Sequence, residues 1–119
     1  MNPDLNWAEV CQLNDIAPDT GVCALVEGQQ VAIFRQAGSD RLFAIGNFDP
    51  VGQVNVLSRG LLAQLGDRLT VASPLYKQHY CLETGQCLEK PELSVPVFQV
   101  RLDAGKVLVS TAERSRNAA

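Results

Sequence analysis

The chain alternates short apolar runs with turns that contain glycine or aspartate. Within these runs apolar and polar positions tend to alternate, which predicts β-strands rather than amphipathic helices. The predicted strands are Val22–Val26, Gln30–Phe34, Arg41–Ile45, Arg68–Ala72, Gln78–Leu82, Gln86–Leu88, Phe98–Leu102 and Lys106–Ser110. Short strands at this spacing predict an all-β fold, either an antiparallel β-sandwich or a partly open barrel.

Turn residues indicate where the hairpins lie. Glu27-Gly28-Gln29 and Asp103-Ala104-Gly105 each separate two predicted strands, and Thr84-Gly85 separates two more. Glycine and aspartate adopt the backbone conformations that such turns require. The segment Ser58–Leu65 instead has leucines at helical spacing between a capping serine and a terminating glycine. We expect one or two helical turns there, because Gly60 lowers the helix propensity.

Composition limits the classes of partner. A chain of 119 residues has room for one domain. Its 13 acidic and 10 basic residues give a net charge of -3, which does not supply the positive field that nucleic-acid binding needs. No apolar run approaches the length that spans a bilayer. We therefore expect neither a nucleic-acid partner nor a membrane.

The two ends of the chain bear on compartment and domain limits. The N-terminal segment lacks the basic start and apolar stretch of a secretory signal, so we expect a cytoplasmic protein. Its cysteines are then expected to be thiols; they are Cys11, Cys23, Cys81 and Cys87. The C-terminal segment has no apolar anchor. We expect a folded domain over residues 1–112 and a flexible tail over residues 113–119.

His79 is the single histidine, and any Ser-His-Asp or Cys-His mechanism would have to use it. No nucleophile elbow or phosphate-binding loop accompanies it. A metal site formed by His79, Cys81 and Cys87 is a second hypothesis, provided that the Thr84-Gly85 turn brings Cys87 opposite Cys81. Three ligands are fewer than structural zinc normally has. The alternative is an exposed histidine beside two half-buried thiols.

Two segments of the chain carry a more specific signal. Phe43-Ala44-Ile45-Gly46-Asn47 resembles the strand that leads into the Cys-x-His pair of the Rieske ferredoxin family. Val71-Ala72-Ser73-Pro74-Leu75-Tyr76 resembles its Cys-Pro-x-His loop, and Tyr80–Gly85 resembles the hairpin that follows. The opening segment from Trp7 to Leu13 fits the first strand of the family. The resemblance covers residues 7–110 and implies a Rieske-like fold with a smaller inserted subdomain of loops and a hairpin.

The positions that match the cluster ligands carry different side chains. A Rieske centre uses two thiolates and two imidazoles. The matching positions here are Asp49 and Val51 in the first loop, and Ser73 and Tyr76 in the second. The resemblance therefore implies a Rieske-like domain that has lost its [2Fe–2S] site.

A narrower resemblance concerns the loops themselves. Asn47-Phe48-Asp49-Pro50, Val56–Gly60 and Ala72–Leu75 with Lys77-Gln78 resemble the small subunits of the assimilatory NAD(P)H nitrite reductases. The resemblance implies a heteromeric oxidoreductase that reduces nitrite to ammonia. In that family the large subunit carries FAD, an iron–sulfur cluster and sirohaem. The small subunit would bring no cofactor and would not be catalytic alone.

Loops on a rigid β scaffold are where such a domain is expected to contact its partner. The residues predicted to dock on the large subunit are Asp49, Pro50, Arg59, Ser73, Leu75, Tyr76 and Lys77. Two alternatives stay open from the sequence. One is an electron carrier that binds a metal through the His79, Cys81 and Cys87 set. The other is a Rieske-like electron-transfer or binding module of another oxidoreductase system.

Overall fold

The structure is a computed structural model that describes residues 7–113. Its strands are β1 (Ala8–Gln12), β2 (Thr20–Val26), β3 (Gln29–Arg35), β4 (Leu42–Gly46), β5 (Phe48–Asp49), β6 (Val54–Asn55), β7 (Leu61–Leu65), β8 (Arg68–Ala72), β9 (His79–Cys81), β10 (Val97–Asp103) and β11 (Lys106–Glu113). Two single 3-10 turns, η1 (Leu13–Asp15) and η2 (Leu57–Arg59), are the helical elements of the described residues. The all-β class predicted from the sequence is confirmed.

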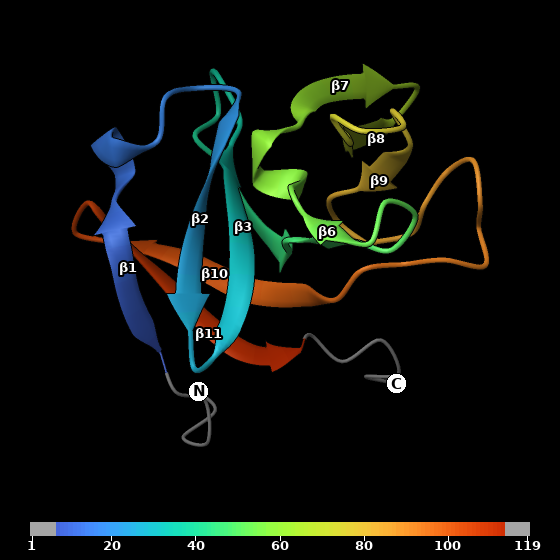
Figure 1. The fold of residues 1–119 in the computed structure, drawn as a ribbon. Helices are drawn as coiled ribbons and strands as arrows, with labels where there is room; N and C mark the ends of the chain where they lie inside the picture. Colours follow the sequence, from blue (N-terminus) through green and yellow to red (C-terminus); the bar gives the residue numbers. More distant parts are fainter. Residues whose placement is uncertain (1–6, 114–119) are drawn as a thin grey trace, which may run out of the picture.

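Six antiparallel strands form the main sheet, in the order β1-β11-β10-β4-β3-β2. The sheet curls until its two edge strands, β1 and β2, approach one another, which makes a nearly closed barrel (Figure 1). Two of its hairpins turn through two residues with positive φ, Glu27-Gly28 and Ala104-Gly105. Such turns match the twist of the strands that they join. Both hairpins were predicted from the sequence.

The inserted subdomain lies on one side of the main sheet, at the right of Figure 1. It consists of the β5-β6 pair, η2 and a three-stranded sheet in the order β7-β8-β9. Alternate residues of β3 supply two separate cores. Ala32 and Phe34 pack with the subdomain residues Leu57 and Tyr80. Val31 and Ile33 pack inside the barrel with residues of β4, β10 and β11.

Of the one or two helical turns expected over Ser58–Leu65, one forms at the start of the segment, and the helical expectation is wrong for the remainder. Only the single turn of η2 forms, and the chain then continues as β7, paired to β8 from Leu61↔Ala72 to Leu65↔Arg68. Two features favour the hairpin. Gly66, with φ 62°, makes the tight turn into β8. A Cβ at Gly60 would lie 2.3 Å from the Ala72 carbonyl oxygen, so glycine permits this close approach of the two strands.

The predicted strand Gln86–Leu88 is reduced to two isolated bridges, Tyr80↔Cys87 and Gln86↔Ser94. The ladder breaks because neighbouring residues of this segment pair with different parts of the chain. Cys87 donates its backbone N–H to the Leu93 carbonyl. The predicted tail begins at Glu113, the last residue of β11; residues 114–119 lie outside the described range.

Candidate functional site

Two loops of the subdomain lie side by side. Loop 1 (residues 50–53) connects β5 to β6, and loop 2 (residues 73–78) connects β8 to β9. They are the segments whose sequences resemble the Rieske cluster loops. Their side chains touch, because Leu75 of loop 2 lies over Gly52 of loop 1. A Cβ at Gly52 would be 2.6 Å from the Leu75 Cδ1 atom.

Asn47 fixes the base of loop 1. Its side chain is buried, donates to the Gln30 Oε1 atom at 3.0 Å and accepts the Ser58 N–H at 2.7 Å. Its carbonyl accepts the N–H groups of Val56 and Leu57 at 3.0 and 3.1 Å. The chain that enters loop 1 is therefore tied directly to the chain that leaves it.

Asp49 joins loop 1 to the three-stranded sheet. Its Oδ2 atom accepts a 2.5 Å hydrogen bond from the Ser73 hydroxyl, and its Oδ1 atom accepts a 2.8 Å hydrogen bond from the Tyr80 hydroxyl. All three residues are buried: Asp49 and Tyr80 are 0% exposed and Ser73 is 1% exposed. We call Asp49, Ser73 and Tyr80 the clasp.

The clasp holds an ionised carboxylate. Burial raises the pKa of Asp49, but the hydrogen bonds from Ser73, Tyr80 and the Val51 N–H outweigh burial and leave the pKa below its ordinary value. Burial, followed by the hydrogen bond to Asp49 and the charge of its carboxylate, raises the pKa of the Tyr80 phenol. At neutral pH the clasp is therefore a carboxylate with protonated hydroxyl donors, an arrangement that stabilises structure rather than transferring protons.

Loop 1 closes around Asp49. The Val51 N–H donates to the Asp49 Oδ1 atom at 2.9 Å, and the Gln53 N–H donates to the Asp49 carbonyl at 2.7 Å. Gln53 has φ 63°, in the left-handed region that costs energy for a residue with a side chain.

Loop 2 closes around Ser73 in the same way. The Leu75 N–H donates to the Ser73 Oγ atom at 3.3 Å, and the Lys77 N–H donates to the Ser73 carbonyl at 3.1 Å. Lys77 also has φ 63°. The two loops thus have matched geometry, and the first hydrogen-bonding residue of each belongs to the clasp.

The predicted docking residues fall into two groups. Asp49 and Ser73 are buried, so their side chains lie behind the surface and cannot touch a partner while the loops stay closed. Leu75 and Tyr76 are 46% and 64% exposed, and Lys77 is exposed beside them. We call these three residues the loop 2 face.

Two further predicted docking residues lie outside the loop 2 face. Pro50 in loop 1 is half-buried, and Arg59 is exposed at the end of η2, which packs against β2 and β3. Whether these residues bind a partner stays a prediction.

Tyr80 was not among the predicted site residues. Its role becomes visible only with the strand pairing of the structure. Val71 and Tyr80 are paired in the register of β8 and β9, so Tyr80 faces the core. A buried tyrosine hydroxyl needs a hydrogen-bond partner, and a carboxylate in a neighbouring loop is one that could supply it.

The residues at the Rieske ligand positions do not fit a [2Fe–2S] cluster. They offer a buried carboxylate that is already hydrogen-bonded, a buried serine hydroxyl, an exposed phenol and an isopropyl group; the positions are Asp49, Ser73, Tyr76 and Val51. Rieske clusters need thiolate and imidazole donors, which none of these side chains provides.

The hypothetical metal set does not assemble either. Within residues 7–113, no three His, Cys, Asp or Glu side chains are grouped so that they could hold a metal ion. Cys87 pairs with Tyr80 rather than with Cys81, which puts the two thiols on opposite faces of the strand pair. Both thiols are buried rather than half-buried, and all four cysteines are free. His79 contacts Glu89, with its Nδ1 atom 2.7 Å from Oε2.

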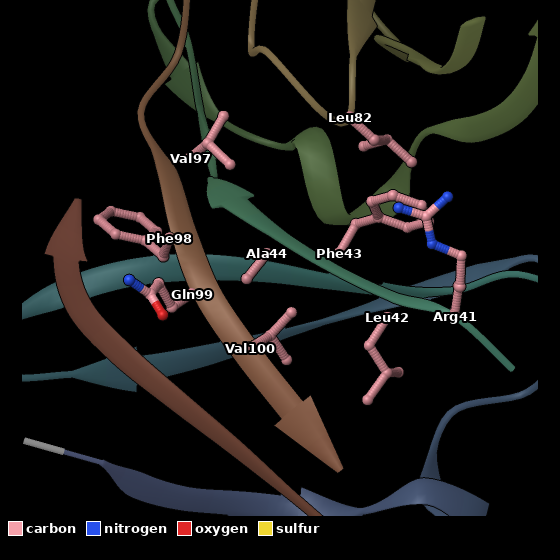
Figure 2. A pocket seen from close by; sticks show the side chains of 9 residues that line it. All are labelled: Arg41, Leu42, Phe43, Ala44, Leu82, Val97, Phe98, Gln99 and Val100. Atoms are coloured by element: carbon pink, nitrogen blue, oxygen red, sulfur yellow. The ribbon is translucent and has the colours of Figure 1, made fainter. Parts of the chain in front are cut away.

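A pocket of about 240 Å³ opens elsewhere, where β4 and β10 diverge (Figure 2). Arg41 stacks over the Phe43 ring at its rim, 4.8 Å from the ring centre, and its Nη2 atom is 3.7 Å from the Glu83 carboxylate. Gln99 and apolar side chains, among them Val100, supply the rest of the wall. The lining offers no nucleophile and no acid–base pair, so the pocket is not a candidate active site.

The comparisons with known proteins bear on the same region of the chain. Residues 6–110 match the family described as Rieske-like [2Fe-2S] domain. The chain is 48% identical to the nitrite reductase (NADH) small subunit of Escherichia coli strain K12 and 50% identical to that of Salmonella typhimurium. Each alignment covers 85% of this chain and 94% of the relative.

A longer relative contains a similar segment. The chain is 36% identical to part of the nitrite reductase [NAD(P)H] large subunit of Klebsiella oxytoca, over 93% of this chain but only 11% of that one.

Solved structures agree with these relatives. The Escherichia coli small subunit has a TM-score of 0.83 at 46% identity, covering 90% of this chain and 97% of that one. The Erwinia carotovora small subunit has a TM-score of 0.76 at 49% identity, covering 92% and 84%. The ferredoxin of a Nocardioides aromaticivorans carbazole dioxygenase, 24% identical, shares the fold, with a TM-score of 0.75 over 87% of this chain and 96% of that one.

No helix in the described part of the chain is long and apolar enough to cross a membrane. The fold is Rieske-like, and the loops at the cluster positions lack cluster ligands. The sequence identity of 48% to 50% extends over 85% of the chain. These observations together identify the family. The chain belongs to the nitrite reductase (NADH) small subunits, within the Rieske-like domain family.

Proposed function

We propose that this chain is the small subunit of a cytoplasmic NAD(P)H-dependent nitrite reductase, which reduces nitrite to ammonia in nitrate assimilation. Its role is to dock on the catalytic large subunit and stabilise it. The chain is not catalytic alone. The ionised carboxylate of its site supports this, because hydrogen bonds enclose it.

One observation carries this proposal. The large subunit of Klebsiella oxytoca contains a segment related to nearly the whole of this chain. A domain that occurs both as a separate subunit and as part of a large-subunit chain is expected to function in contact with the large subunit. Linking two partners in one chain keeps them together through a high effective concentration, whereas a separate subunit needs a docking surface of its own.

The loop 2 face supports docking. It presents an apolar and an aromatic side chain, Leu75 and Tyr76, next to the cation Lys77. For Lys77, as for Arg59 on η2, the described residues provide no ion-pair partner. Aromatic and apolar anchors ringed by charge are typical of interface centres. The complementary surface on the large subunit is therefore expected to be apolar with acidic side chains at its edge.

We also propose that this chain brings no cofactor of its own and that FAD, sirohaem and an iron–sulfur cluster reside on the large subunit. The oxygen donors at Asp49, Ser73 and Tyr76 support this, because iron–sulfur clusters are held by thiolates or imidazoles. The test is visible absorption and iron content after anaerobic purification and cluster reconstitution. We expect a colourless, iron-free chain; stoichiometric iron with a Rieske-like spectrum would contradict it.

Activity of the reconstituted complex tests the function. Purified large subunit is titrated with this chain while NADH-dependent reduction of nitrite to ammonia is followed. We expect the activity or the thermal stability of the large subunit to rise and to saturate at a fixed ratio of the two chains. A large subunit that neither binds this chain nor changes in activity or stability would contradict the proposal.

A further inference from the structure

We infer that the clasp of Asp49, Ser73 and Tyr80 is a positioning device that holds loops 1 and 2 in the docking arrangement before the large subunit arrives. The inference rests on the proposed function and adds residues that no partner touches directly. It assigns to Tyr80 a role in association, although Tyr80 is completely buried.

The first step of the argument is connectivity. The Asp49 carboxylate accepts hydrogen bonds from both sides of the site: from the Val51 N–H within loop 1, from the Ser73 hydroxyl at the start of loop 2, and from the Tyr80 hydroxyl on β9. Hydrogen bonds to a charged acceptor are stronger than those between neutral groups. One carboxylate therefore ties loop 1 to β9 and to loop 2, which carries Leu75.

The second step is strain. Each loop ends its internal turn at a residue with φ 63°, Gln53 in loop 1 and Lys77 in loop 2. A residue with a side chain keeps this conformation only where the surroundings enforce it. The N–H groups of Gln53 and Lys77 donate to the backbone carbonyls of Asp49 and Ser73. The side chains of these two clasp residues accept the N–H groups of Val51 and Leu75. The clasp therefore fixes the two residues whose carbonyls hold Gln53 and Lys77 in this conformation, and without it the backbone of each loop has less to keep it strained.

The third step concerns the exposed side chains. Leu75 reaches across to Gly52, so its position depends on loop 1 staying where the Asp49–Ser73 hydrogen bond holds it. If the loops separate, only a fraction of molecules presents the loop 2 face correctly, and the apparent affinity falls by that fraction. A buried positioning group should therefore change the association rate. A contact residue mainly changes the dissociation rate.

The experiment measures binding kinetics and amide hydrogen exchange on the full chain with the purified large subunit. The variants Tyr80→Phe and Ser73→Ala each remove one clasp hydroxyl. The matched control is Thr70→Val, which removes another buried hydroxyl, bonded to the Ala63 carbonyl at 2.8 Å in the same small sheet. Exchange is followed at the four loop amides that close the turns: Val51, Gln53, Leu75 and Lys77.

For both clasp variants we expect about tenfold slower association, from the loss of one hydrogen bond to a charged group. The dissociation rate should not change, and exchange at the four loop amides should be faster. Thr70→Val should leave association and loop exchange as in the wild type. If Tyr80→Phe fails to fold, Ser73→Ala decides.

Two results would overturn the inference while the proposed function stands: association rates like that of Thr70→Val, or loop exchange like that of the wild type. A wild-type chain that does not bind the large subunit would instead overturn the proposed function, and the inference with it.

Discussion

Asp49 is a buried charge whose environment has been adapted to keep it ionised. An isolated carboxylate is costly to bury, and the cost is offset only when its oxygens accept hydrogen bonds. Two hydroxyls and a backbone N–H do so here. The sequence marked Asp49 and Ser73 as altered ligand positions, but it could not show that the two side chains bond to one another, because burial and long-range contact are properties of the fold.

The lowered pKa of Asp49 predicts a pH dependence of stability. Because the folded pKa lies below the unfolded value of about 3.9, the carboxylate contributes its full stabilisation above that value. This contribution is lost as the pH falls through the folded pKa. We expect the free energy of unfolding to be higher for the wild type than for Asp49→Asn at pH 7. The difference should shrink below about pH 4.

The free energy of unfolding of both proteins is measured by urea unfolding from pH 7 to pH 3. The contributions of other titrating groups, such as Glu89, cancel in the difference because both proteins contain them. A difference that stays constant down to pH 3 would show that ionisation of Asp49 is not what stabilises the clasp.

At the scale of elements, the strands and hairpins could be predicted where alternation and turn chemistry agree, as in β2-β3 and β10-β11. The prediction failed at β7, where leucine spacing and hairpin pairing conflict. Leu61 is 75% exposed, whereas Leu57 is fully buried. These leucines therefore do not form one helical face, and pairing with β8 decides the conformation. The pairing partner, β8, follows directly after the turn at Gly66, and the spacing of the leucines within Leu57–Leu65 does not reveal that pairing.

Gly60 marks this junction and supplies a prediction for it. A Cβ at Gly60 would meet the Ala72 carbonyl and the Val71 Cγ2 atom at 2.3 and 2.6 Å, so the paired backbones must separate. We expect Gly60→Ala to lower the free energy of unfolding by about 1 to 3 kcal/mol. Gly52→Ala is the comparison. Its new Cβ would meet the flexible end of Leu75 at 2.6 Å and the Asp49 Oδ2 atom at 3.3 Å, but no backbone atom, so it should cost less. Equal costs in thermal or urea unfolding would contradict this account of the junction.

At the scale of the molecule, the barrel is a scaffold and the subdomain presents the loops. If the loop 2 face docks on the large subunit, Leu75→Asp should abolish association and leave the chain folded, because Leu75 is 46% exposed. Arg59 lies outside the loop 2 face, at the end of η2, and Arg59→Glu should weaken association if the docking surface extends to η2. Residues at the centre of a protein–protein interface commonly contribute over 2 kcal/mol to the binding free energy, which corresponds to roughly a thirtyfold change in affinity.

Pull-down with the large subunit, and circular dichroism of each isolated variant, measure the two effects. Complexes that form normally with both variants would place the docking surface elsewhere. An unfolded Leu75→Asp chain would show that Leu75 stabilises the domain, contrary to its assignment to the loop 2 face.

The most direct measurement of the central claim is co-purification from the native host. The chain is tagged, isolated under gentle conditions, and its partner is identified by mass spectrometry, with Leu75→Asp as the matched control. We expect a single dominant partner, the nitrite reductase large subunit, to be recovered with the wild type and lost with the variant. Recovery of a different oxidoreductase, or of no partner, would contradict the account.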